Sequence, residues 1–448
     1  MVLREMGPGK RTRRVRITVA LLVLELCLGH TAVAQSTGQT VRHHKVADQD
    51  SASPRELAEA EVAIEKRDYI AAQPLLEKIV AANAANYQAW FDLGFVYNNL
   101  GKTQESIAAY RKSVAAKPDV FESNLNLGLM LAKTDQPDAE QFLRAATTLK
   151  PTANADEGHA RAWLSLARVL ENSKPEDAIA AYKQSAKLDP KDPEPHLSAG
   201  ALLEKGNHFA DAEQEYKTAL AIDPKSSDAL IGLANIYMRG NRFADAEAVL
   251  RQLAALHPND AAVHTQLGRA LAASGKNDDA IAELQTAAKL APSPGIQRDL
   301  ADLYTTAGKY DQAEGQYRAL VAASPNDAEL HHGLGVALLK QRKFPEAQQE
   351  FLTAVKLKSD MGVAYGDLAI AAVENKNYEL AIKAADARAK FLPEIPISFF
   401  LRASAYDHLR DYKMASQNYH RFLELANGQF PDQEWQARHR LIAIEPKK

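Results

Sequence analysis

The sequence predicts an all-α protein, an α-solenoid of about eleven helix–turn–helix repeats of 34 residues with a capping helix at its C-terminal end. Three observations predict this fold class. The chain has a 34-residue period, small residues recur at two fixed positions of every repeat, and a proline stands near the end of most repeats. A period of this length is typical of solenoids, in which each repeat buries its apolar face only against its neighbours.

The repeats begin after a polar stretch at 35–52, and each is numbered internally from position 1. Position 8 is always Gly or Ala, as in Gly94 and Gly200, and position 20 is always small, as in Ala212. Small residues let two helices pack closely, so position 8 is assigned to the first helix of a repeat and position 20 to the second. The array covers 53–427, in repeats at 53–86, 87–120, 121–153, 160–192, 193–226, 227–260, 261–293, 294–327, 328–361, 362–395 and 396–427.

Large residues and helix breakers complete the pattern. Positions 11 and 24 are mostly Leu or an aromatic residue, as in Tyr97 and Tyr110. Position 11 lies on a helical stripe with positions 4, 7 and 8, and position 24 lies on a second stripe with positions 20, 21 and 28. Proline at position 32, as in Pro118, ends the second helix because it disfavours helical backbone in the preceding residue. Glycines such as Gly101 and Gly206 predict the turn between the two helices.

These residues resemble the tetratricopeptide repeat (TPR) family. The repeat at 87–120 matches the family pattern almost throughout, with Trp90, Leu93, Gly94, Tyr97, Tyr110 and Pro118. The resemblance implies a right-handed superhelix whose concave face is built mainly from the first helices. Glu59 and Arg402 depart from it, since they replace Leu at position 7 of the terminal repeats, as solvent-facing residues of end caps would. Residues 154–159 interrupt the array and are expected to form a joint.

The first 34 residues have the pattern of a secretory signal peptide. Basic residues precede the apolar run 17–28, and Ala32-Val33-Ala34 supplies the small residues of a cleavage site. Cleavage after Ala34 predicts a secreted or periplasmic protein with no stable membrane span, an exported bacterial member of the family. The sequence leaves open whether the signal is an ordinary secretory or a twin-arginine one, and an uncleaved anchor is the alternative. Residues 35–52 are expected to be a disordered linker, and 428–448 to hold the capping helix and a tail.

Composition excludes several classes of protein. The chain has 448 residues, 54 Lys and Arg against 57 Asp and Glu, and no basic block in its body, which argues against a nucleic-acid partner. Its single cysteine, Cys27, excludes a disulfide framework. The array leaves no room for a catalytic domain, so we expect no enzyme activity and no cofactor. His196, His264 and His331 occupy position 4, a packing position, and are expected to be structural rather than metal ligands.

A candidate binding site lies on the face of the first helices turned away from the seam within each repeat. In the second to sixth repeats this face is apolar and is the predicted partner-binding groove; its residues are Phe91, Phe95, Leu125, Leu129, Leu164, Leu197, Ile231 and Met238. In the next two repeats, at 261–293 and 294–327, the same face is polar; its residues there are Thr265, Arg269, Arg298, Asp302 and Thr305. Two interpretations stay open: position 5 packs partly against the neighbouring repeat, or the face is a solvent-facing groove for a peptide or helix.

The sequence therefore predicts a non-enzymatic scaffold or adaptor of the cell envelope, whose concave groove binds a peptide or helix of a protein partner. The alternative is an accessory subunit of a complex that makes or exports a glycan. Sugar sites favour exposed aromatic rings beside carboxylates, and the neighbourhood of Phe400 and Asp407 is the part of the groove that fits this alternative.

Overall fold

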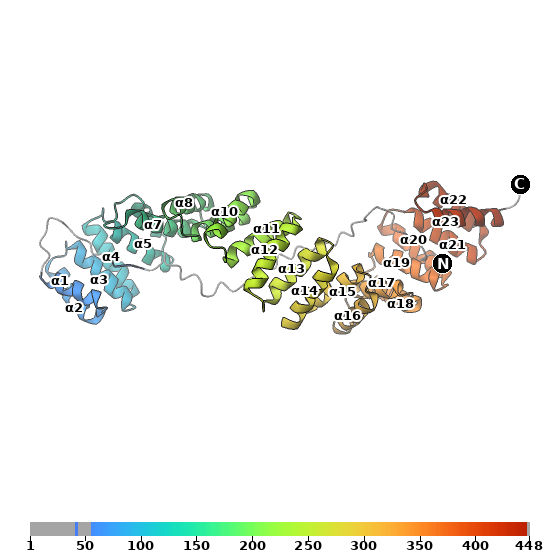
Figure 1. Cartoon of the computed structure of the whole chain (residues 1–448), viewed down its shortest axis with the longest axis horizontal. Helices are drawn as coiled ribbons and strands as arrows, with labels where there is room; N and C mark the ends of the chain where they lie inside the picture. The colour runs from blue at the N-terminus through green and yellow to red at the C-terminus, as the bar shows by residue number, and fades with distance from the viewer. Residues whose placement is uncertain (1–40, 44–54, 446–448) are drawn as a thin grey trace. The chain divides into compact units, whose positions relative to one another are not determined.

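The computed structural model describes residues 41–43 and 55–445, which contain 23 α-helices and no strand. The predicted signal peptide lies outside the described residues, as does the predicted linker apart from 41–43. The described helices divide into two compact units, which meet in sequence between Leu256 and His257. In each unit the helices follow one another as antiparallel pairs (Figure 1). The predicted all-α solenoid of helix–turn–helix repeats is confirmed.

The N-terminal unit contains six helix pairs. They are α1 (Arg55–Glu65), α2 (Tyr69–Ala82), α3 (Tyr87–Asn99), α4 (Thr103–Ala116), α5 (Phe121–Lys133), α6 (Ala139–Ala146), α7 (Ala155–Leu170), α8 (Pro175–Leu188), α9 (Glu194–Lys205), α10 (Phe209–Ile222), α11 (Ser227–Arg239) and α12 (Phe243–Leu256). Each odd-numbered helix is the first helix of a repeat and packs against the helix that follows it.

The C-terminal unit contains five further pairs and the predicted capping helix. They are α13 (Ala261–Ala273), α14 (Asn277–Leu290), α15 (Pro294–Thr306), α16 (Tyr310–Ala323), α17 (Ala328–Lys340), α18 (Phe344–Leu357), α19 (Gly362–Glu374), α20 (Tyr378–Phe391), α21 (Pro396–His408), α22 (Tyr412–Ala426) and α23 (Pro431–Ile444). Helix α23 packs on α22 through the buried Ala437 and Leu441. Trp435 on the same helix is 61% exposed, and its ring lies 3.9 Å from the His439 ring.

The small residues lie at the seams, as the pattern predicted. A Cβ added to Gly200 would come within 2.9 Å of the Tyr216 ring, and one added to Gly232, in the next repeat, within 2.3 Å of the same ring. Tyr216 is 4% exposed and its hydroxyl lies 3.0 Å from Glu204 Oε2. One aromatic side chain therefore fills the space between two repeats, and glycine is needed on both sides of it.

The turns inside the repeats use left-handed backbone, although not always at the expected residue. Gly101 has φ 75° in the turn, as predicted. After α9, however, Gly206 has φ −77° and the next residue, Asn207, takes φ 63°. Asparagine is among the non-glycine residues that best tolerate this conformation, so the turn forms one residue later than expected.

Two predicted irregularities are corrected. The joint expected at 154–159 is helical from its second residue onward, because α7 begins at Ala155 and runs without a break into the repeat, while Asn154 precedes the helix with φ 47°. Its first turns pack: the His159 ring meets Phe121 edge-on at 5.7 Å, and its Nε2 lies 2.7 Å from the Leu149 carbonyl. Arg402 is not solvent-facing but 7% exposed, held by Asp386 and Glu394. Glu59, at the other end, is exposed as expected.

Within the described ranges, no helix combines the length and the apolar character that crossing a membrane requires.

Candidate functional site

The eight residues of the predicted groove lie on the first helices of five successive repeats: Phe91 and Phe95 on α3, Leu125 and Leu129 on α5, Leu164 on α7, Leu197 on α9, and Ile231 and Met238 on α11. The last three are half-buried. The first five are buried, with exposed fractions between 0% and 9%. Of the two interpretations left open for this face, the solvent-facing one is therefore wrong for these five side chains.

Packing between repeats explains much of this burial. Leu125 and Leu129 on α5 belong to one apolar cluster with Leu166 and Leu170 of α7, and Leu164 belongs to another with Ala199 of α9. Position 5 thus faces the following repeat, which was the other interpretation of the pattern. The Phe91 ring also lies 5.8 Å from Tyr110, inside its own repeat.

A segment from before the array covers the rest of this face. The His43 ring lies 5.1 Å from the Phe95 ring and 6.1 Å from the Phe91 ring, and its Nε2 is 2.7 Å from Oδ1 of Asp92. Both members of this polar pair are largely buried, with side chains 17% and 5% exposed. Imidazole stacking and a hydrogen bond to a carboxylate therefore hold His43 on α3.

The two preceding residues contact α5 and α7. Val41 packs against the apolar clusters of both neighbouring repeats. The Asn126 Nδ2 donates to the carbonyl of Arg42 at 3.0 Å, and Nη1 of Arg42 lies 2.8 Å from Oε1 of Glu157. We call the surface formed by Phe91, Phe95, Asp92, Asn126 and Glu157 the α3–α5–α7 surface. It binds both the backbone and the side chains of a non-helical stretch of chain.

The polar residues of this surface are not among those predicted from the sequence. Asp92 and Asn126 both occupy position 6 of their repeats, one residue after the apolar position 5. The next two repeats also have a hydrogen-bonding side chain at that position, Ser165 and Ser198, so residue type at position 6 does not by itself indicate a site for backbone. The polar composition of 35–52 predicts a disordered linker. Composition carries no information about the contacts that residues 41–43 make with Asp92, Asn126 and Glu157.

A buried arginine lies beside the segment. Arg161 on α7 is 8% exposed, and its Nε and Nη2 have no hydrogen-bond partner among the described residues. Burial, and next the charge of Arg42, lower the pKa of the Arg161 guanidinium to about 10. Arg161, Arg42, Asn126 and Glu157 border a cavity of about 30 Å³, room for about one water molecule or one oxygen atom of a ligand.

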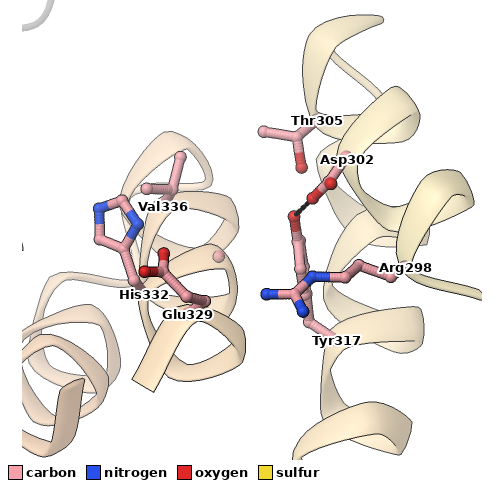
Figure 2. A pocket seen from close by; sticks show the side chains of 8 residues that line it. Arg298, Asp302, Thr305, Tyr317, Glu329, His332 and Val336 are labelled. Atoms are coloured by element: carbon pink, nitrogen blue, oxygen red, sulfur yellow. Dashed lines mark hydrogen bonds between the residues drawn. The ribbon is translucent and has the colours of Figure 1, made fainter. Parts of the chain in front are cut away.

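The C-terminal unit contains a larger and more polar cavity of about 240 Å³ (Figure 2). Arg298, Asp302 and Thr305 of α15 and Tyr317 of α16 face Glu329, His332 and Val336 of α17 across it. These residues include three of the five polar ones expected here. Thr265 is buried and its hydroxyl donates to the Ala261 carbonyl, and Arg269 is paired with Asp299.

Polar contacts fix the walls of this cavity. The Tyr317 hydroxyl donates to Asp302 (Figure 2). Burial raises the pKa of Asp302 above its ordinary value, although this hydrogen bond acts in the opposite direction. The Nε2 of His332 lies 2.8 Å from Oδ2 of Asp367. The groups that line the cavity are thus already bonded to neighbours, and the guanidinium of Arg298, 3.6 Å from Asp327, is 43% exposed.

The position-4 histidines tie repeats together. The Nδ1 atoms of His196, His264 and His331 each lie 2.6 Å from a glutamate oxygen on the second helix of the same repeat. In His264 and His331 the other ring nitrogen lies 3.0 Å from the carbonyl of the proline that ends the preceding repeat. Their assignment as structural residues is supported by these contacts. The described residues contain no group of three or more His, Cys, Asp or Glu side chains arranged to hold a metal ion.

The neighbourhood of Phe400 and Asp407 does not have the features that the glycan hypothesis needs. Phe400 is 2% exposed and packs on Tyr419 and Phe422. Asp407 is 8% exposed and accepts hydrogen bonds from Arg440 at 2.6 and 2.7 Å. Phe400 is therefore not an exposed ring and Asp407 is not an available carboxylate, so this expectation is corrected.

Comparison with known families gives the class of protein. Models of the tetratricopeptide repeat match residues 57–121, 97–154, 134–193, 207–270, 265–328, 298–364 and 332–407. Because these matches cover more than half of the chain, the protein belongs to the tetratricopeptide repeat family. Repeats of this family generally serve as scaffolds for interactions between proteins.

Solved structures of other repeat proteins are similar at low identity. YrrB, described as a TPR protein with an unusual peptide-binding site, is 20% identical over 42% of this chain and 96% of its own, with a TM-score of 0.39. A MamA protein is 23% identical over 37% and 92%, with a TM-score of 0.36. The C-terminal part of a TPR protein from Cytophaga hutchinsonii is 17% identical over 53% and 98%, with a TM-score of 0.45. No curated protein matches the sequence.

Proposed function

We propose that this protein is a non-enzymatic scaffold or adaptor that works in the cell envelope and binds a peptide segment of a protein partner on its α3–α5–α7 surface. The chemistry of the surface supports this function. It combines two aromatic rings, two carboxylates and a side-chain amide on successive first helices, a combination suited to holding both the side chains and the backbone of a ligand.

The observation that carries the proposal is the hydrogen bond from Asn126 to the carbonyl of Arg42. An amide that donates to main chain recognises any sequence in that register, while neighbouring pockets select the side chains. Asn126 is 2% exposed with Arg42 in place, and its Nδ2 also lies 3.5 Å from the Tyr110 hydroxyl, a second contact that orients the amide. The non-helical course of residues 41–43 favours a peptide over a helix as the ligand.

The envelope location is supported by the order of residues in the first 34 positions: basic, then apolar, then small. This order is typical of a secretory signal peptide. The single cysteine, Cys27, lies within that segment, so a mature chain beginning at Gln35 has none. Such a chain needs no control of thiol oxidation in an oxidising compartment.

The partner test compares two altered chains. The unaltered protein is immobilised, exposed to envelope extract, and its bound proteins are identified by mass spectrometry. Asp92→Asn combined with Asn126→Ala removes the charge that faces His43 and the amide that donates to backbone, so a specific partner should be lost. Asp278→Asn makes the same carboxylate change at a side chain that is 86% exposed in the other unit, and the partner should be retained.

Equal recovery by the two altered chains would contradict the proposed surface. Unfolding midpoints of both chains accompany the measurement, because loss of partner counts only for a chain that is folded.

A further inference from the structure

We propose that Val41–His43 is a built-in occupant of the α3–α5–α7 surface, and that a partner displaces it with a segment of matching chemistry: an aliphatic residue, a variable residue, then histidine. This inference rests on the proposed function and names the ligand of the same surface. The segment is part of this chain but lies outside the repeats, which begin at 53.

Histidine is assigned to the third place because its ring satisfies two different requirements. It lies against the rings of Phe91 and Phe95, and its Nε2 reaches Asp92 at 2.7 Å. An apolar ring at this place would leave Asp92, which is 4% exposed, without its bond to the segment. A lysine could bind the Asp92 carboxylate but has no flat ring to pack against Phe91 and Phe95.

An aliphatic residue is assigned to the first place because Val41 contacts two apolar clusters at once. One cluster contains Phe91 and Phe95, and the other contains Leu125 and Leu129. A side chain that bridges two repeats removes apolar surface of both from water. A polar or charged side chain at this place would lose that contact and leave its own polar group dehydrated.

The second place is variable because its side chain experiences opposing charges. The Arg42 guanidinium meets Glu157 at 2.8 Å, with side chains 39% and 55% exposed, and exposed pairs of this kind contribute little. The positive charge of the buried Arg161 repels that of Arg42. What the surface binds at this place is the backbone, through the bond from Asn126 to the Arg42 carbonyl.

Covalent connection favours the built-in segment over a free ligand. Only eleven residues separate His43 from the start of α1 at Arg55. Tethering over a short distance gives an effective concentration on the order of millimolar, so a free peptide must compete with a segment that is always nearby. The partner therefore needs either additional contacts or a high local concentration of its own.

The test uses a fluorescent synthetic peptide with the sequence of residues 39–46 and three full-length chains. The peptide should bind the Val41→Asp/His43→Ala chain at least about tenfold more tightly than the unaltered chain, because the altered tether no longer competes. Val363→Asp is the control: it makes the same valine-to-aspartate change at a side chain that is 55% exposed in the other unit. That chain should bind the peptide as weakly as the unaltered one.

Changes in the peptide test the assigned places. Replacing the residue that corresponds to Val41 by Asp, or that corresponds to His43 by Ala, should weaken binding to the Val41→Asp/His43→Ala chain about tenfold or more. Replacing the residue that corresponds to Arg42 by Ala should change it less than about threefold. If the Arg42 replacement costs as much as the His43 replacement, the assignment of a variable second place is overturned.

Failure of this inference and failure of the proposed function give different results. If the peptide binds all three chains equally, or none of them, while the envelope partner still depends on Asp92 and Asn126, then the surface binds a partner but Val41–His43 is not its occupant. If the envelope partner is indifferent to Asp92 and Asn126, the proposed function itself fails, whatever the peptide does.

Discussion

The replacement of Gly333 by alanine tests the packing between repeats most directly. A Cβ added to Gly333 on α17 would lie 2.4 Å from Cε1 and 2.5 Å from Cζ of Tyr317 on the preceding repeat. Carbon atoms in favourable contact are about 3.5–4.0 Å apart, so the ring would have to retreat by about 1 Å or more. Tyr317 is 4% exposed and bonded to Asp302, which leaves the ring little room to move.

The expected magnitude combines terms of opposite sign. Overpacking a well-packed core costs about 1–3 kcal/mol. A weakened bond between Tyr317 and Asp302 adds about 0.5–1.5 kcal/mol. Alanine in place of glycine inside a helix returns up to about 1 kcal/mol. Gly315→Ala on α16 of the same unit makes the same gain in helix propensity without a collision, since a Cβ there meets nothing within 4 Å. The difference in stability between the two altered chains therefore measures the collision alone.

The two substitutions should therefore have opposite effects. Gly315→Ala should stabilise the protein by up to about 1 kcal/mol, and Gly333→Ala should be less stable than Gly315→Ala by about 1.5–4.5 kcal/mol. Repeat arrays need not unfold in one step, so urea unfolding should be accompanied by hydrogen exchange of α15 to α18. Exchange should accelerate in α16 and α17 in the Gly333→Ala chain.

A second substitution decides whether the Tyr317 ring is the cause. In a chain that carries Tyr317→Leu, the cost of Gly333→Ala should largely disappear, because the ring that collides with the new methyl group is gone. If Gly333→Ala is as stable as Gly315→Ala, or if its cost is unchanged by Tyr317→Leu, the packing described for this seam is wrong.

Three further predictions concern the buried face, pH and export. Phe91→Ala should destabilise the protein by about 3–5 kcal/mol in urea unfolding, because the ring is 0% exposed. A change below about 1 kcal/mol would show that the ring is exposed to solvent rather than buried. Burial alone would lower the pKa of His264, but its bonds to Glu283 and to a backbone carbonyl raise it above the ordinary value. The stabilisation is then fully present below about pH 6.5 and is lost as pH rises through the folded-state pKa, so His264→Gln should flatten the fall in stability above pH 6.5; an unchanged pH profile would contradict this. N-terminal sequencing of the exported protein should begin at Gln35, and a start at Met1 would refute cleavage after Ala34.

The sequence by itself determined the repeat architecture. Close packing of two helices within 34 residues requires small residues at positions 8 and 20, and proline and left-handed turn residues end helices through their own backbone chemistry. These constraints are local, so they can be read from spacing alone. The one-residue shift from Gly206 to Asn207 marks their limit, because both residue types suit such a turn and the helix length decides between them.

Only the tertiary structure decided which apolar residues are covered and by what. Phe91 and Leu125 have the same position in their repeats, and their burial depends on the neighbouring repeat and on a segment from outside the array. The contacts of that segment join residues 49 positions apart, in the case of His43 and Asp92, and 115 apart, in the case of Arg42 and Glu157. Contacts at such separations depend on how the repeats stack, and no local pattern of residues records them. The period of the sequence therefore specified the scaffold, and the stacking of its repeats specified the surface that holds Val41–His43.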